Sequence, residues 1–119
     1  MSEKLSILIV EDEPLIAMML EDFLLSLGHE IKAICESVDA GVEAAKDGDI
    51  DLAILDVNVD GQQVWPVAEI LRDRSIPMVL ATGGHLQDPP ADFKNMPTLS
   101  KPYTIDSVPP VIDEALARA

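Results

Sequence analysis

Five short segments of the chain have the length and composition of buried strands. Short apolar segments rich in branched residues are expected in a parallel sheet that is covered on both faces. The two clearest segments run directly into acidic residues, the first at Glu11 and the second at Asp56. The five predicted strands are Leu5–Val10, Glu30–Ile34, Leu52–Asp56, Ile76–Ala81 and Thr98–Ser100.

Apolar residues recur at helical spacing between most of these strands. The predicted helices cover residues 14–27, 38–46, 64–71 and 108–116. Pro66 fits its helix only in the first turn, where no amide donor is needed, and Pro109 and Pro110 belong in the first turn of the last helix or mark its start. The segment between Gly84 and Pro97 should also form a helix, but its tandem prolines would each cost about 3 kcal/mol or more in a helix interior. We therefore expect an irregular or shortened fourth helix.

Alternating strands and helices predict an α/β fold with right-handed parallel crossovers. We expect a doubly wound, flavodoxin-like, five-stranded parallel sheet with the order 2-1-3-4-5. Residues 1–119 then form a single domain without an output domain, since no linker, repeat or low-complexity segment interrupts the pattern. In this order the first and third strands are neighbours, so the loops that follow them should meet.

The predicted strands carry polar residues at the edge of the sheet where ligands bind in such folds. These residues are Glu11, Asp12, Asp56, Thr82 and Lys101. Carboxylates about 4 Å apart repel by roughly 4 kcal/mol per pair at an effective dielectric constant near 20, so a divalent cation is expected between them. Carboxylate and carbonyl oxygens select Mg²⁺, which usually binds one or two carboxylates together with phosphate oxygens.

This set of side chains suits phosphoryl transfer, which needs an in-line nucleophile and positive charge near the phosphoryl oxygens. Asp56 is the candidate nucleophile and would form an acyl phosphate. Asp12 and Glu11 would hold the metal together with Asp56 and the backbone carbonyl of Asn58. Lys101 would offset the remaining negative charge. Thr82 would donate its hydroxyl to a phosphate oxygen.

The amino-acid composition limits the classes of partner that the protein could bind. Eight basic and 22 acidic residues give a formal net charge of −14, and aromatic residues make up 3% of the chain. This charge would repel nucleic acid and anionic lipid, so basic protein surfaces and cations are the expected partners. No apolar stretch approaches the roughly 20 residues of a membrane span, and no signal peptide is evident. The lone Cys35 is expected to be a small buried residue, His29 a polar surface residue, and the protein cytoplasmic.

The motifs together resemble the response-regulator receiver domains of two-component signalling. The resemblance rests on Ile9–Pro14, Leu55–Asn58 with Gly61, Ala81–Gly83 and Ser100–Pro102. It implies that a sensor histidine kinase or phosphotransfer protein phosphorylates Asp56, that Glu11 and Asp12 bind Mg²⁺, and that the Lys101-Pro102 bond is cis. Segments 80–83 and 101–103 look like the FAT-GUY subgroup of stand-alone receivers, although Leu80 replaces the usual phenylalanine.

One departure from the family concerns signal output. The position three residues before Lys101 is often aromatic in receivers, but here it is Thr98, which excludes an aromatic switch at that position. We therefore expect the segment from Gly83 to Met96 to report phosphorylation by changing its order. Gly84, without a side chain to shield the acyl phosphate, suggests a short-lived phosphate. His85, close to the proposed site, is a candidate for a supporting role.

Two other functions compete with this interpretation. A pseudo-receiver would use the same fold as a binding module without accepting phosphate, which the intact acceptor set disfavours. A flavodoxin-like or haloacid-dehalogenase-like enzyme would need a glycine-rich phosphate loop after the first strand or a second acid two residues after the nucleophile. The chain has Glu11-Asp12 at the first place and Asn58 at the second. We therefore expect no enzymatic activity beyond the protein's own phosphorylation and dephosphorylation, and a downstream partner whose identity the sequence does not give.

Overall fold

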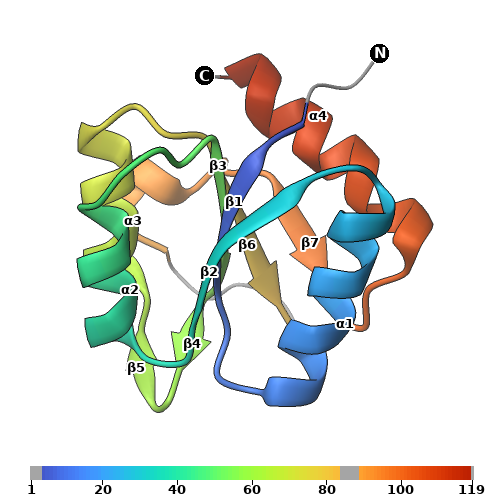
Figure 1. The fold of residues 1–119 in the computed structure, drawn as a ribbon. Coiled ribbons are helices and arrows are strands. Elements are labelled where there is room, and N and C mark those ends of the chain that lie inside the picture. Colours follow the sequence, from blue (N-terminus) through green and yellow to red (C-terminus); the bar gives the residue numbers. More distant parts are fainter. Residues whose placement is uncertain (1–3, 84–88, 119) are drawn as a thin grey trace.

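Five parallel strands form one sheet in the order β2-β1-β3-β6-β7, in a computed structural model that describes residues 4–83 and 89–118 (Figure 1). The strands are β1 (Ser6–Val10), β2 (Glu30–Cys35), β3 (Leu52–Asp56), β6 (Met78–Thr82) and β7 (Thr98–Ser100). Counted among the five strands of this sheet, the order is the predicted 2-1-3-4-5. The three central strands are buried almost throughout, as their apolar sequences require.

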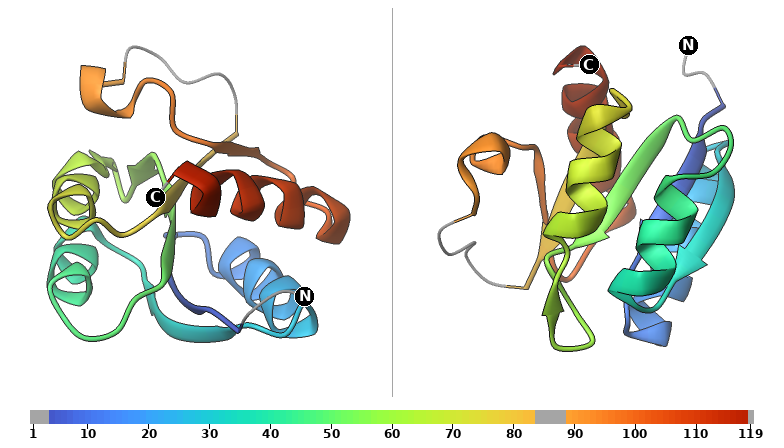
Figure 2. Two further views of the ribbon diagram at one scale, coloured as in Figure 1. Left: turned by 90° about the horizontal axis from the view of Figure 1, so that it is seen from above. Right: turned by 90° about the vertical axis from the view of Figure 1, so that its left-hand side faces the viewer.

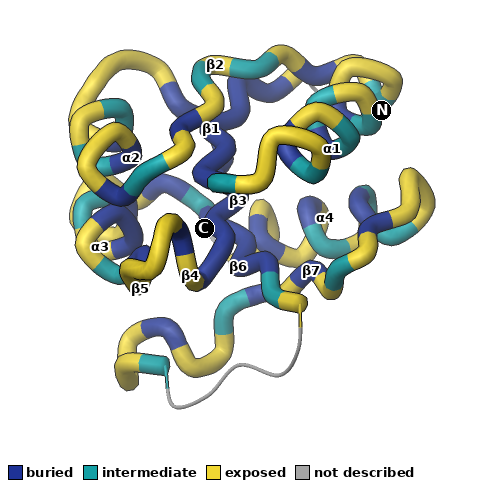
Figure 3. The backbone as a smooth tube through the Cα atoms, turned by 90° about the horizontal axis from the view of Figure 1, so that it is seen from below, coloured by how far each residue is buried: buried dark blue, intermediate teal, exposed yellow. Residues whose placement is uncertain are grey.

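Helices cover both faces of the sheet. The helices are α1 (Pro14–Ser26), α2 (Val38–Ala45), α3 (Trp65–Asp73) and α4 (Val108–Arg118). Side chains of α1 and α4 pack in one core cluster, whereas those of α2 and α3 pack in the cluster on the opposite face (Figure 2). Figure 3 shows the central strands β1, β3 and β6 as a buried layer between helices whose outer surfaces are exposed. The doubly wound α/β prediction is therefore confirmed.

Prolines mark the helix starts where the sequence placed them. Pro14 and Pro66 lie in the first turns of α1 and α3. Pro109 and Pro110 directly follow Val108, the first residue of α4. The missing amide donors fall where a helix has no intrahelical partner for them, so these prolines do not interrupt hydrogen bonding. A short 3₁₀ helix, η2 (Ile105–Ser107), precedes α4.

In its described part, the crossover from β6 to β7 contains only a three-residue 3₁₀ helix, η1 (Ala91–Phe93). Pro89 and Pro90 directly precede η1, which confirms the expected shortening of the fourth helix. Phe93 is 1% exposed and belongs to the core cluster on the α2 and α3 face. Residues 84 and 85, for which the sequence suggested roles, lie outside the described residues.

Two features differ from the sequence-based expectations. The segment after Asp56 is a β-hairpin, formed by β4 (Asn58–Val59) and β5 (Gln62–Gln63), rather than a simple loop. His29 is buried, with 8% of its surface exposed, because its Nδ1 accepts a hydrogen bond from the Leu5 backbone N–H at 3.1 Å. The surface placement of His29 was therefore wrong. Cys35 is buried, as expected.

Candidate functional site

The sheet register brings the predicted site residues to one edge. Asp56 is the last residue of β3 and pairs with Ala81, which directly precedes Thr82 on β6. Thr82 in turn pairs with Ser100, the residue before Lys101. Because all these strands are parallel, their carboxyl ends lie together, and the side chains that follow them converge.

Three carboxylates gather at this edge. Glu11, Asp12 and Asp56 each offer an oxygen, and these oxygens lie within 4.8 Å of one another. Glu11 is 2% exposed and Asp56 is 8% exposed, whereas Asp12 is half-buried. Buried carboxylates at this separation repel one another strongly, so the cluster requires a positive charge.

Lys101 supplies one positive charge to the cluster. Its Nζ lies 2.9 Å from Glu11 Oε1 and 3.1 Å from Asp56 Oδ2. Burial by itself would lower the pKa of the Lys101 ammonium, but the hydrogen bonds to Glu11 and Asp56 outweigh burial and raise the pKa. Lys101 therefore stays charged and bridges the ends of β1 and β3. The sequence predicted the charge compensation but not that Glu11 would be the nearer partner.

The environment of the Glu11 carboxyl group changes its pKa strongly. Burial raises its pKa to about 7, and the negative charge of Asp56 adds to this, although the Lys101 ammonium and the Glu13 backbone N–H act in the opposite direction. The Glu13 N–H donates to Glu11 Oε2 at 3.2 Å. With a pKa of about 7, the Glu11 carboxyl group gains or loses its proton near neutral pH in the metal-free protein. The cluster as it stands has more carboxylates than one ammonium can neutralise.

The β4–β5 hairpin closes one side of the site. The Asp60 backbone N–H donates to Asp12 Oδ2 at 2.8 Å. Asp60 and Gly61 both have positive φ, 51° and 77°, as the two central residues of a type I′ hairpin turn require. The Asp-Gly pair is a sequence signal for such a turn, although the flanking strands are only two residues long. The hairpin holds the Asp12 carboxylate in place and also carries Asn58.

Thr82 and Lys101 are joined through their backbones. The Lys101 N–H donates to the Thr82 carbonyl at 2.9 Å, and the Thr82 side chain is half-buried. The Lys101-Pro102 peptide bond is cis, as the family resemblance implied. Tyr103 is buried two residues later, and its pKa is raised by burial and by the negative charges of Glu11 and Asp56. These residues form the side of the site opposite the acidic loop.

The donor set fits Mg²⁺. Its side-chain ligands are three carboxylates, and hard oxygen ligands of this type select Mg²⁺ over metals that prefer nitrogen or sulfur. Two of the three carboxylates are buried, which raises the gain from a bound cation. The arrangement offers a cation site directly beside the Asp56 carboxylate.

Comparison with known proteins decides the family. The response regulator receiver domain family matches residues 7–107. The chain belongs to this family. The receiver resembles SdrG from Sphingomonas melonis Fr1, with 47% identity and a TM-score of 0.81 over 98% of this chain and 97% of SdrG. A structure of the BeF3-activated conformation of SdrG from Pseudomonas melonis Fr1 matches with the same identity and TM-score, over 98% of this chain and 99% of the other.

A second relative is a longer protein. The response regulator PhyR from Brucella abortus is 30% identical, with a TM-score of 0.81, over 98% of this receiver but only 49% of PhyR. The receiver thus corresponds to about half of that chain. A search of curated proteins found no match. Among residues 4–83 and 89–118, no helix is both long and apolar enough to cross a membrane.

The comparisons test some of the expectations from the sequence and leave others as predictions. They confirm the receiver family and the fold. Membership of the FAT-GUY subgroup stays a prediction. At the position that is often aromatic in receivers, Thr98 is exposed and donates its hydroxyl to the Met96 carbonyl at 3.1 Å. The roles of the individual site residues stay predictions.

Proposed function

We propose that the protein is a phosphoacceptor response regulator of the cytoplasm. A sensor histidine kinase or phosphotransfer protein would transfer a phosphoryl group to Asp56, and the receiver would then act as a switch, shuttle or sink through contacts with another protein. The observation that carries this proposal is the placement of Asp56, buried at a strand end with Lys101 Nζ 3.1 Å away and two further carboxylates beside it. Phosphoryl transfer depends mainly on such positioning and charge compensation.

The transfer needs no further co-reactant. An oxygen of Asp56 attacks the phosphorus of a phosphohistidine, the new P–O bond forms as the P–N bond breaks, and the electron pair leaves with the imidazole nitrogen. Lys101 stabilises the negative charge that develops on the phosphoryl oxygens. The Thr82 hydroxyl would donate to one of these oxygens once the group is in place. This contact would distinguish the phosphorylated state from the free one.

Glu11, Asp12, Asp56 and the Asn58 carbonyl would hold Mg²⁺. When bound, the ion would neutralise charge on the carboxylates and on the incoming phosphoryl group. The Asp60 N–H already fixes the orientation of Asp12. Binding at this site therefore requires little rearrangement of the hairpin.

An apolar surface beside the site suits a phosphodonor protein. Leu15 and Met18 lie on α1, are 79% and 55% exposed, and follow the acidic loop by a few residues. Large exposed apolar side chains next to a reactive centre are candidates for protein contacts. We propose that the phosphodonor packs against this part of α1 while its phosphohistidine reaches Asp56.

Acetyl phosphate with Mg²⁺ tests the chemistry without a kinase. We expect intact-protein mass spectrometry to show one added phosphoryl group in the wild type and in Asp47→Asn, a control at an exposed carboxylate, and none in Asp56→Asn. Labelling that survives in Asp56→Asn would refute the assignment of the acceptor. If neither acetyl phosphate nor phosphoramidate labels the wild type, the protein is a pseudo-receiver.

A kinase panel tests the partner. Phosphotransfer from an autophosphorylated histidine kinase to Leu15→Glu should fall, whereas acetyl phosphate labelling of the same variant should not. Leu116→Glu, at an exposed apolar residue of α4, serves as the matched control. Equal loss of both reactions in Leu15→Glu would indicate damage to the site itself rather than to docking.

A further inference from the structure

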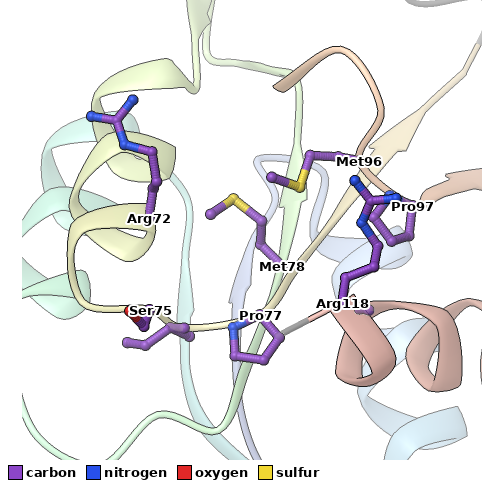
Figure 4. A pocket seen from close by; sticks show the side chains of 9 residues that line it. Arg72, Ser75, Pro77, Met78, Met96, Pro97 and Arg118 are labelled. Carbon is purple, nitrogen blue, oxygen red and sulfur yellow. The ribbon is translucent and has the colours of Figure 1, made fainter. Parts of the chain in front are cut away.

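A pocket of about 290 Å³ lies at the amino ends of β6 and β7, at the opposite edge of the sheet from Asp56. Met78, the first residue of β6, and Met96 form its apolar floor, and Pro97 and Ala115 contribute to its walls. Figure 4 shows the Met78 and Met96 side chains reaching toward each other, with Arg118 extending alongside Pro97. The pocket is therefore separate from the phosphoacceptor site.

The short crossover accounts for the hollow. In its described part, the connection from β6 to β7 has three helical residues, and these pack on α3 through Phe93. They leave the space between the carboxyl ends of α3 and α4 open over the first residue of β6. Met78 is 4% exposed and Met96 is half-buried. The floor of the pocket therefore consists of packed side chains, and part of the Met96 side chain is accessible to a ligand.

The charge of the pocket is opposite to that of the protein. The chain has 22 acidic residues, yet none of them lines the pocket, whereas two of its eight basic residues, Arg72 and Arg118, do. Arg72 is already paired with Asp73 and Asp92. Arg118 takes part in none of the ion pairs found among the described residues. One guanidinium is thus available next to an apolar surface.

We propose that this pocket binds a small aliphatic carboxylate, with the hydrocarbon on the methionine floor and the carboxylate on Arg118. Guanidinium and carboxylate groups pair in a bidentate manner, and unbranched methionine side chains adapt to flexible hydrocarbon. The volume is at the lower limit of the roughly 300–1,000 Å³ typical of ligand pockets, which favours a short ligand. The proposal does not depend on the chemistry at Asp56.

Octanoate is a suitable probe, in an NMR titration of the full chain labelled with ¹⁵N. We expect saturable amide shifts confined to the pocket lining, with a dissociation constant of about 1 mM. Arg118→Gln should weaken octanoate binding about fivefold and leave 1-octanol binding unchanged. Lys46→Gln removes one exposed positive charge elsewhere and should bind like the wild type. Met96→Gln should weaken both probes, because both need the apolar floor.

Several results would overturn the proposal. One is a response to octylamine as strong as the response to octanoate, since the charge of the pocket would then play no part. Another is a linear, non-saturating shift with octanoate. Shifts of the same amides on raising the protein concentration alone would assign the pocket to a second copy of the chain. Saturation by an acidic, leucine-containing peptide without any octanoate response would assign it to a partner protein.

Discussion

The ring of Trp65 stacks on the ring of Phe93, with centroids 5.4 Å apart and planes 8° from parallel. Trp65 begins α3, and Phe93 is the last residue of η1. The Arg72 guanidinium also lies over Phe93, 5.7 Å from the ring centroid, and pairs with Asp92. The short segment that replaces a fourth helix is therefore held on α3 by three neighbouring contacts: a ring stack, a cation–π contact and an ion pair.

Replacing Phe93 should release this segment. We expect Phe93→Ala to lower the free energy of unfolding by about 3–5 kcal/mol, because a buried ring is lost from the core. Trp65 is the only tryptophan, so its emission should shift to longer wavelength in the folded variant. Urea unfolding followed by circular dichroism and fluorescence would measure both effects. Phe23→Ala, at a half-buried ring on α1, should destabilise less and leave the emission unchanged.

The pKa of Glu11 predicts a pH-dependent stability. Its folded-state pKa is raised from 4.5 to about 7, so the folded protein binds a proton more tightly than the unfolded chain. The resulting stabilisation is complete below about pH 4.5 and is lost as the pH rises through 7. Without Mg²⁺, Glu11→Gln should therefore be more stable relative to the wild type at pH 8 than at pH 5, in urea titrations. A difference that does not change between these pH values would contradict the shift.

Adding Mg²⁺ should stabilise the wild type more than Glu11→Gln at pH 8. The wild type should gain stability with increasing Mg²⁺ at pH 8, because an ion that binds only the folded state stabilises it by mass action. Glu11→Gln should gain less, since it offers one carboxylate fewer. Thermal unfolding over a Mg²⁺ series, with Ca²⁺ in parallel, would show this. Equal gains in the two proteins would remove Glu11 from the metal site.

Lys101 should compete with the metal. Its ammonium occupies the space between Glu11 and Asp56, so Lys101→Met should raise Mg²⁺ affinity by roughly tenfold in isothermal titration calorimetry. The same variant should respond less to beryllofluoride, because it lacks the Lys101 ammonium that would offset the negative charge of the bound group. Lys94→Met, at an exposed lysine, is the control and should bind Mg²⁺ like the wild type. Weaker Mg²⁺ binding in Lys101→Met would mean that the lysine supports the metal site instead.

His29 should matter for stability through a single hydrogen bond. His29→Leu leaves the Leu5 N–H without its acceptor, which should cost about 1–3 kcal/mol of unfolding free energy. His29→Asn keeps an acceptor oxygen near the position of Nδ1 and should recover part of the loss. Urea unfolding of the three proteins at one pH would compare them. Equal stability of the Leu and Asn variants would show that ring packing, rather than the hydrogen bond, holds this turn.

Local sequence patterns accounted for most of the fold. Leu52–Asp56 was predicted with the bounds that the structure gives to β3, because a buried parallel strand has a nearly continuous apolar run, here residues 52–55, which ends at Asp56. Pro89 and Pro90 predicted the shortened helix, because a proline in a helix interior removes a backbone hydrogen bond wherever it lies in the fold. The burial of His29 was missed because its partner, the Leu5 N–H, is 24 residues away in sequence. No local pattern reports such a pairing.

The sequence predicted which residues meet at the site better than it predicted the contacts between them. Strand ends placed Asp56, Thr82 and Lys101 at one edge, since parallel strands share their carboxyl ends. The contact between Lys101 and Glu11 depends on the path of the loop after β1, which sequence spacing does not define. The hairpin after Asp56 was missed although Asp60-Gly61 is a known turn pair, because strands of two residues produce no detectable alternation.

The backbone bond between the Lys101 N–H and the Thr82 carbonyl limits how the receiver can move. A shift of β6 along the sheet would break this hydrogen bond between Lys101 and Thr82. Rotation of the Thr82 side chain would leave this hydrogen bond intact, and Gly83, which is exposed and has no Cβ, is the first residue beyond it. If Thr82 contacts the phosphoryl group as proposed, a side-chain rotation at this one residue is the change that keeps the register of the sheet.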